Sequence, residues 1–283
     1  MLTSRIAALV EYDGTVFNGW QTQQKGAFIE DFLVNSISKV ADAPISIVAA
    51  GRTDSGVHAS GQVIHFDTFA ERRPYSWLCG INTHLPSAIR VRWIGTVTSD
   101  FHARYSALAR RYRYLIYNSP TPSAFLTTQC TFERTNLDVE AMSKAAQFLV
   151  GEHDFSSFRD SQCQSVSPNR HVFACDVVRS NDFVVIDITA NAFVHHMVRN
   201  IAGSLLAIGK SKKEADWLKS VLEARDRRVA GITASPNGLY LVKVYYPSVF
   251  GVIDHEIGPY FHPGQRCPAP CDTRIIPERK KEA

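Results

Sequence analysis

The chain has 283 residues, of which 45% are hydrophobic and 20% are charged, and its formal net charge is +4 at pH 7. This composition excludes a disordered or fibrous protein and predicts one large globular domain or two closely packed ones. The mild excess of positive charge permits a polyanionic partner without requiring one.

The first residues, MLTSRIAALVEYDG, contain an apolar run that is too short to span a membrane, and they lack the cleavage site of a secretory signal. We therefore expect a cytoplasmic protein with no membrane partner. Six scattered cysteines do not form a disulfide framework, so we expect them to stay reduced. Cys267 and Cys271 could offer two thiolates to zinc, but a closed structural site needs four ligands, and we expect no metal.

Hydrophobic periodicity divides the first half of the chain into alternating strands and helices. Period-two alternation predicts a strand at 5–13, and amphipathic spacing predicts a helix over 26–44 that Pro44 ends. Two strands, a helix and a strand are expected next, at 45–51, 61–69, 74–86 and 88–97.

The second half predicts much the same series of elements. The expected order is strand, helix, two strands, two helices and a strand, at 111–118, 138–151, 171–180, 182–190, 193–209, 213–224 and 238–246. Two split βαβ units whose sheets join would account for this order. After Tyr246 the periodicity fails and prolines interrupt the chain, so we expect an extension that is partly disordered.

Residues 49–66, AAGRTDSGVHASGQVIHF, place one carboxylate, Asp54, two residues after Arg52 in a glycine-punctuated segment. An Asp side chain accepts hydrogen bonds from nearby backbone amides, and Gly56 can adopt a positive φ, so the segment is typical of a turn. On local sequence alone, a turn is sufficient to explain why Asp54 occurs in this segment. A catalytic role for Asp54 needs support from elsewhere in the chain.

Residues 101–118, FHARYSALARRYRYLIYN, bring arginines and tyrosines together. In a strand, Tyr112 and Tyr114 share one face, and Arg111 and Arg113 share the other. Arginines that contact phosphates and aromatic rings that stack on bases are the two components of a surface for single-stranded or loop RNA. The alternative is an ordinary sheet with buried tyrosines and solvated arginines, and the pattern favours neither.

The helix predicted at 193–209 carries an apolar stripe that indicates core packing. Arg199 interrupts this stripe, and a guanidinium in such surroundings needs an anionic partner because an unpaired buried charge is very costly. His195 and His196 are adjacent, so we expect them to point to different sides of the helix as structural or RNA-proximal residues rather than metal ligands.

Three common functional motifs are absent from the sequence. No Gly-x-x-x-x-Gly-Lys-Ser/Thr loop occurs, which argues against hydrolysis of a nucleoside triphosphate. The chain also lacks a Gly-x-Gly-x-x-Gly fingerprint, so no nucleotide cofactor is expected. No Gly-x-Ser-x-Gly elbow marks an α/β-hydrolase serine.

Four segments together resemble the tRNA pseudouridine synthase A family, whose members isomerise uridine in the anticodon stem-loop of tRNA. In chain order, the matching stretches are YDGTVFNGWQTQ, GRTDSGVHASGQVIHF, FHARYSALARRYRYLIYN and NAFVHHMVRNIAG. The likeness extends from Arg5 to Tyr246. It implies formation of pseudouridine at tRNA positions 38, 39 and 40 by C1′–N1 cleavage, base rotation and C1′–C5 bond formation. Because this reaction is redox-neutral, no cofactor is expected.

The resemblance also implies an α/β (α+β) fold. Two ferredoxin-like split βαβ halves are expected around a continuous, mainly antiparallel sheet, with the active-site cleft between them. The expected divisions are an N-terminal half with the Asp loop at 1–100, a C-terminal half with the tyrosine strand and arginine helix at 101–250, and the extension at 251–283. Family members act as homodimers, so we expect a homodimer with tRNA as its partner.

Three catalytic residues follow from the resemblance. Asp54 matches the nucleophilic aspartate, and Tyr112 matches the tyrosine that can stack on the detached uracil and take the C5 proton. Arg199 is expected to be the buried counter-charge of Asp54, since an adjacent arginine favours the ionised carboxylate. The sequence leaves open whether Asp54 attacks C1′ or removes a proton to give a glycal.

Other residues are expected to contact the RNA. Arg52 is the expected wedge or phosphate contact that holds the target nucleotide out of the helix, because chemistry at C1′ requires a flipped uridine. Leu239 or Leu241 is expected to face the base. The remaining candidates are Arg72, Phe101, His102, Ala103, Arg104, Tyr105, Gln162, Cys163, Gln164, Ser165 and Val166.

Two other classes of function stay open on the sequence. A catalytically inactive RNA-binding module would explain the arginine and tyrosine strand, although the aromatic RNP pattern is absent. A nucleoside or glycoside hydrolase could use Asp54, with Glu11 or Asp13 as the second carboxylate that this chemistry usually needs.

Overall fold

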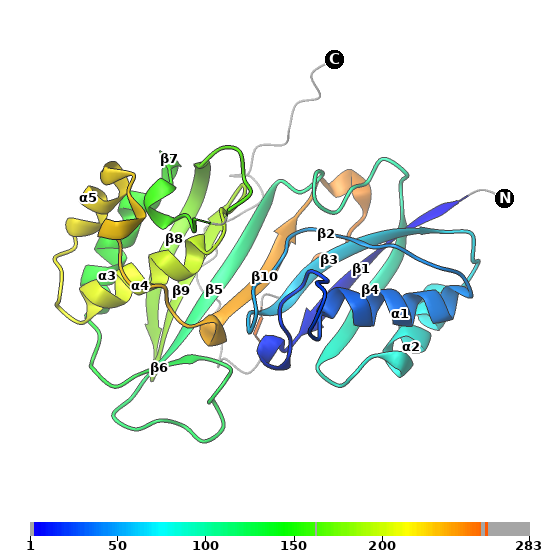
Figure 1. The fold of residues 1–283 in the computed structure, drawn as a ribbon, viewed down its shortest axis with the longest axis horizontal. Helices are drawn as coiled ribbons and strands as arrows, with labels where there is room; N and C mark the ends of the chain where they lie inside the picture. The colour runs from blue at the N-terminus through cyan, green and yellow to red at the C-terminus, as the bar shows by residue number, and fades with distance from the viewer. Residues whose placement is uncertain (1–2, 162, 256–257, 260–283) are drawn as a thin grey trace, which may run out of the picture. The chain divides into compact units, whose positions relative to one another are not determined.

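The computed structural model describes residues 3–161, 163–255 and 258–259 (Figure 1). The chain divides into two compact units: the first runs to Leu108 and resumes at Leu241, and the second is Ala109–Tyr240. The domain divisions expected at residues 100 and 250 stay a prediction. Gln162, Cys267, Cys271 and most of the predicted extension lie outside the described residues.

The first unit has the strand and helix order of a split βαβ fold. Its elements are β1 (Ser4–Tyr12), α1 (Ile29–Ala41), β2 (Val48–Ala49), β3 (His58–Thr68), α2 (Pro74–His84), β4 (Ile89–Val97) and most of β10 (Leu239–Tyr245). β1 lies between β3 and β4 and is antiparallel to both, with Ile6 opposite Phe66 and Thr96. The strand order is β4-β1-β3-β10, and β2 also pairs with β3.

Two amphipathic helices cover strands of the first unit. In α1, Ile29, Leu33 and Ile37 recur every fourth residue and are fully buried, which is the spacing of one helix face. α2 begins at Pro74, whose fixed φ suits a first helical turn, and it buries Trp77. The two helices contact each other, and α2 contacts β4 (Figure 1).

The second unit has the same alternation of strands and helices. Its elements are β5 (Ala109–Asn118), β6 (Thr131–Glu133), α3 (Val139–Ala146), β7 (Gly151–Asp154), β8 (Asn169–Ser180), β9 (Phe183–Ala190), α4 (Met197–Gly209) and α5 (Trp217–Ala224). The strand order is β5-β9-β8-β7, and β6 runs parallel to β5. β9 is antiparallel to both neighbours, with Ile188 opposite Tyr112 and Cys175.

Short 3-10 helices connect several of these elements. They are η1 (Gly14–Val16), η2 (Gln147–Leu149), η3 (Ser156–Phe158), η4 (Arg227–Val229), η5 (Pro236–Gly238) and η6 (Ser248–Phe250). The longest α-helices in the described part of the chain, α1 and α4, have 13 residues each. No helix within the described residues combines the length and apolar character needed to cross a membrane.

The predicted fold class is confirmed, because the described chain is mixed α/β and the strands within each unit pair mainly antiparallel. Several predicted elements differ in extent, and three differences are the most informative. The helix expected from 193 begins only at Met197, because His196 adopts a left-handed φ of 61°. The strand expected at 45–51 shortens to Val48–Ala49. The helix expected at 138–151 ends at Ala146 and leads through η2 into β7, a strand that periodicity missed.

Candidate active site

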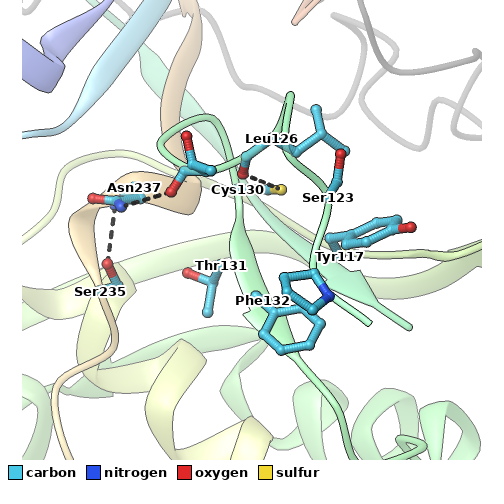
Figure 2. A pocket seen from close by; sticks show the side chains of 10 residues that line it. Tyr117, Ser123, Leu126, Cys130, Thr131, Phe132, Ser235 and Asn237 are labelled. Atoms are coloured by element: carbon cyan, nitrogen blue, oxygen red, sulfur yellow. Dashed lines mark hydrogen bonds between the residues drawn. The ribbon is translucent and has the colours of Figure 1, made fainter. Parts of the chain in front are cut away.

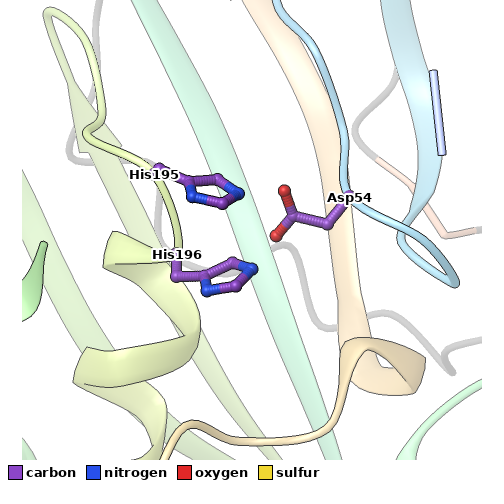
Figure 3. A group of neighbouring side chains, drawn as sticks. All are labelled: Asp54, His195 and His196. Carbon is purple, nitrogen blue, oxygen red and sulfur yellow. The ribbon is translucent and has the colours of Figure 1, made fainter. Parts of the chain in front are cut away.

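Asp54 lies in the loop between β2 and β3 of the first unit, where it is half-buried (Figure 3). The Val57 N–H donates to the Asp54 carbonyl at 3.1 Å. Gly56 follows Ser55 with a φ of 76°, a conformation that favours glycine. The turn expected from the sequence is therefore present, and it carries a carboxylate that is partly exposed.

The two carboxylates considered as a second acid or base have other partners in the first unit. Asp13 Oδ1 accepts from the Thr15 N–H at 3.0 Å and lies 3.1 Å from His58 Nδ1. The hydrogen bond with His58 lowers the pKa of Asp13 well below its usual range, against the opposing effect of burial. Glu11 lies 3.4 Å from Arg92 Nη1. An Asp13 that stays ionised is poorly suited to act as a general acid.

Tyr112 lies on β5 of the second unit and is 9% exposed. Its ring meets that of Phe193 edge to face, with centroids 4.9 Å apart. Tyr114 shares the same face of β5 by alternation, and its hydroxyl donates to the Ser235 carbonyl at 2.9 Å. Burial raises the pKa of Tyr114 to about 12. Tyr114 is therefore a protonated structural residue at neutral pH.

Arg199 lies in the first turn of α4 and is half-buried. Its Nε donates to the Ala234 carbonyl at 2.9 Å, and the Ala234 N–H donates to the Arg199 carbonyl at 3.1 Å. These reciprocal bonds fix the orientation of the side chain. Sequence reasoning missed Ala234 as a partner of Arg199. The acceptor is a backbone carbonyl, which every residue has, so the residue type does not indicate this bond.

The prediction that His195 and His196 point to different sides of a helix was wrong. Both precede α4, and their rings stack with centroids 4.0 Å apart (Figure 3). Asp160 lies 3.5 Å from His195 Nδ1 and 3.0 Å from His196 Nδ1. The helical separation of adjacent side chains does not apply, because the left-handed backbone at His196 comes before the helix begins.

Arg111 and Arg113 share a face of β5 as expected, but Arg111 is buried and the Arg113 side chain is only 12% exposed. Asp187 on β9 accepts from Arg111 Nε and Nη2 at 2.6 and 2.7 Å, and from Arg113 Nε at 2.8 Å. The side chains of Arg111 and Asp187 are 3% exposed. Both interpretations are therefore wrong for Arg111, because the sequence did not reveal its buried carboxylate partner.

The predicted RNA contacts in the first unit divide into exposed and buried residues. Arg52, Arg72, Arg104 and Tyr105 are exposed. The Arg104 guanidinium lies 5.7 Å from the centre of the Tyr105 ring, which in turn lies 4.4 Å from the His102 ring. Phe101 and Ala103 are fully buried. The Phe101 side chain therefore anchors this segment in the core.

His65 supports the same segment and was missed by the sequence analysis. Its Nδ1 accepts from the Ala103 N–H at 3.1 Å, and its ring lies 4.9 Å from that of His102. Burial, followed by the charges of Arg5 and His102, lowers the pKa of His65 to about 4. His65 is therefore neutral at pH 7, as its accepting Nδ1 requires.

The predicted RNA contacts in the second unit lie in the loop before β8. Gln164 and Val166 are exposed, and Val166 is completely so. Arg159 Nη2 donates to the carbonyls of Cys163 and Ser165 at 2.9 and 2.7 Å, which sets the shape of the loop. Burial would raise the pKa of the Cys163 thiol, but backbone N–H groups of His195 and Ser165, with Arg159, lower it.

The strand β10 contains both leucines expected to face the base. Leu239 is 5% exposed and Leu241 is fully buried. Leu239 belongs to the second unit and Leu241 to the first, because the division between the units falls inside this strand.

A cavity of about 350 Å³ opens beside β5 and β6 in the second unit (Figure 2). Its lining is mainly apolar or neutral and comprises Tyr117, Pro122, Ser123, Leu126, Thr127, Cys130, Thr131, Phe132, Ser235 and Asn237. The Cys130 thiol donates to the Leu126 carbonyl, and burial raises its pKa to about 11. The cavity therefore holds no reactive thiolate at neutral pH and none of the predicted site residues.

Comparison with known proteins gives concordant results. A family model described as tRNA pseudouridine synthase matches residues 8–106 and 145–247. The tRNA pseudouridine synthase A of Photobacterium profundum is 52% identical over 259 residues, covering 92% of this chain and 99% of the relative. The protein of the same name from Histophilus somni is 51% identical over 257 residues, covering 91% of this chain and 96% of the relative.

A solved structure of a Cbf5-Nop10-Gar1 complex contains a chain similar to 84% of this one and 49% of its own length. The identity is 11% and the TM-score is 0.36, a likeness too weak to carry an argument.

Proposed function

Because the chain belongs to the tRNA pseudouridine synthase family, we propose that it converts uridine to pseudouridine at positions 38, 39 and 40 in the anticodon stem-loop of tRNA. The observation that carries this proposal is the 52% identity to a tRNA pseudouridine synthase A along 99% of that relative. A partly exposed Asp54 in a well-defined turn supports the placement of the chemistry.

Asp54 is the proposed nucleophile. Its carboxylate bonds to C1′ as the C1′–N1 bond breaks, the detached uracil rotates, and C5 then bonds to C1′ and displaces the carboxylate. The C5 proton then leaves and N1 is protonated. Positive charge develops at C1′ as the first bond breaks, and an adjacent carboxylate stabilises it, as in glycoside hydrolysis. The reaction is redox-neutral, so the proposal needs no cofactor.

Tyr112 and Arg199 complete the proposed catalytic group. The Tyr112 ring can stack on the detached uracil, and its hydroxyl can take the C5 proton. Arg199 is the proposed counter-charge that keeps Asp54 ionised. The bond from Arg199 Nε to the Ala234 carbonyl supports a fixed role for this side chain, since it restricts the orientation of the guanidinium.

The exposed arginines supply the proposed RNA contacts. Arg52 holds the flipped nucleotide, Arg72 and Arg104 contact phosphates, and residues 162–166 contact the RNA backbone or bases. We further propose that the protein acts in the cytoplasm as a homodimer, in which one tRNA spans both subunits.

The decisive experiment measures tritium release from unmodified tRNA labelled at uridine C5. The purified protein should release tritium, and Asp54→Asn should release none while still binding tRNA, because the substitution removes the carboxylate and keeps its size. Mapping of pseudouridine in the product tRNA checks positions 38, 39 and 40.

Two outcomes would replace the proposal with another function. No release by the parent protein, with tRNA bound, would indicate an RNA-binding protein without catalysis. Free uracil in place of an isomerised base would indicate a hydrolase that uses Asp54. Full release by Asp54→Asn would remove Asp54 from the reaction.

A further inference from the structure

The segment YDGTVFNGW, residues 12–20, has no role in the proposed chemistry, yet it packs against the loop that carries Asp54 within the first unit. The clearest contact joins two side chains. The hydroxyls of Tyr12 and Thr53 are hydrogen-bonded at 2.8 Å, and these residues are 3% and 7% exposed. Thr53 directly precedes Asp54, so this buried bond acts one residue from the proposed nucleophile.

Backbone contacts hold the same loop from the same segment. The Trp20 N–H donates to the Thr53 carbonyl at 3.0 Å, and the Ser55 hydroxyl donates to the Phe17 carbonyl at 3.2 Å. Residues on both sides of Asp54 are therefore tied to residues 12–20.

Gly19 shows how closely the two segments approach. Its φ is 101°, and a Cβ there would lie 3.0 Å from the Thr53 carbonyl oxygen and 3.2 Å from the Asp54 carbonyl carbon. Only glycine allows the backbone of residues 12–20 to approach this near without displacing the loop. Residues 12–20 therefore form a close-fitting support under Asp54, which we term the cradle.

We propose that Tyr12 is a positioning residue for the reaction and acts through Thr53 on Asp54. The Tyr12 hydroxyl fixes the Thr53 side chain, while the Trp20 N–H fixes its carbonyl, so the main chain entering Asp54 is held at two points. This inference rests on the proposed function, because it says that the cradle holds the Asp54 carboxylate in position to attack C1′.

The physical reason lies in how strongly catalysis depends on geometry. A nucleophile must meet its target at near-contact distance, and a displacement of about 1 Å can slow a reaction by roughly 100-fold. The turn containing Asp54 has glycines on both sides, at Gly51 and Gly56, so its own sequence does little to restrict it. The Tyr12 ring packs near Trp20, with centroids 6.0 Å apart, so Tyr12→Phe removes the hydroxyl and keeps the ring.

The test is single-turnover tritium release and tRNA affinity for Tyr12→Phe, Thr53→Val and the double variant. We expect each single variant to be ~10-fold slower, with the Kd for tRNA within about 2-fold of the parent, because the lost bond aims the nucleophile rather than binding RNA. The double variant should be no slower than either single one, because the two hydroxyls form one bond.

Two further variants separate positioning from general destabilisation. Thr53→Ser keeps the hydroxyl and should restore most of the rate lost in Thr53→Val. Tyr240→Phe removes another buried tyrosine hydroxyl, which donates to the Gln129 carbonyl at 2.7 Å in the second unit, and should keep the parent rate. All rates are measured well below the unfolding temperature of each variant.

Several results would overturn the inference. They are a parent-like rate for Tyr12→Phe, equal losses of rate and affinity, or a Thr53→Ser rate as low as that of Thr53→Val. Failure of the proposed function is a separate result, because the parent protein itself would then release no tritium.

Discussion

Arg104 and Arg111 belong to the same run of arginines and tyrosines, yet their surroundings are opposite. Arg104 is exposed, with its guanidinium over the Tyr105 ring. Arg111 is 3% exposed and forms a two-pronged ion pair with Asp187. The difference teaches that the position of a carboxylate on the paired strand, rather than the arginine's own sequence neighbours, decides whether its charge supports the fold or remains on the surface.

The charge around Arg111 is nearly balanced. Asp187 pairs with both Arg111 and Arg113, and Asp176 on β8 lies opposite Asp187 in the antiparallel register. Burial, and then the charge of Asp187, raises the pKa of Asp176, while Arg111 lowers it. Two arginines and two carboxylates therefore share this part of the sheet, which reduces the cost of burying any one of them.

The largest effect is expected for Asp187→Asn, which leaves two arginines without their shared carboxylate. Breaking a buried ion pair by removing one partner costs about 3–5 kcal/mol, so we expect the free energy of unfolding to fall by roughly that amount. Urea denaturation monitored by circular dichroism measures it. Asp226→Asn is the control, since its exposed pair with Arg228 should contribute little. A parent-like unfolding curve for Asp187→Asn would contradict a structural role.

The sequence predicted most of the fold because its elements have strong local patterns. Ile29, Leu33 and Ile37 recur at helical spacing in α1, and Pro74 marks the start of α2. The errors occurred where backbone conformation overrides pattern. Because His196 has a left-handed backbone conformation, α4 begins later than predicted. β6 has only three residues, which is too short to show a hydrophobic period.

The candidate site was less accessible to sequence reasoning. Asp54 and Tyr112 were predicted through the resemblance and stay predictions, since a turn and a strand tyrosine have no distinctive local signal. The contacts of Thr53 and Arg199 were missed, because the bonds from Thr53 to Tyr12 and from Arg199 to Ala234 join residues far apart in the chain. Asp187 had a weak signal: an ionisable residue inside the apolar run FVVIDITA suggests a buried partner.

His65 extends the comparison to a buried group that stays neutral, because burial outweighs the opposing charge of Asp67. Its pKa is lowered from 6.5 to about 4, so the unfolded chain binds more protons between these values. The stability contribution is therefore complete above pH 6.5 and is lost as the pH falls toward 4. Between pH 6.5 and pH 4, the titration of His65 therefore lowers the free energy of unfolding by about 3 kcal/mol.

We expect His65→Gln to reduce the fall in unfolding free energy between pH 6.5 and pH 4. Some slope should remain, because burial also lowers the pKa values of His102 and His255. Urea midpoints measured across this range for the parent and variant provide the check. An equal slope in both proteins would show that His65 is not the titrating group.

The smallest and most specific effect is expected for Arg104→Gln, because this substitution removes one exposed positive charge from the first unit. If Arg104 contacts a phosphate, its loss should weaken tRNA binding ~10-fold and reduce the slope of log K against log salt by about one counterion. Single-turnover tritium release at saturating protein should be nearly unchanged, since no step of the proposed chemistry uses this residue. Arg90→Gln is a matched control, because Arg90 donates to the carbonyls of Pro86 and Ile89 and should not affect the salt slope. An unchanged slope for Arg104→Gln would remove Arg104 from the RNA surface and leave its exposure without a functional explanation.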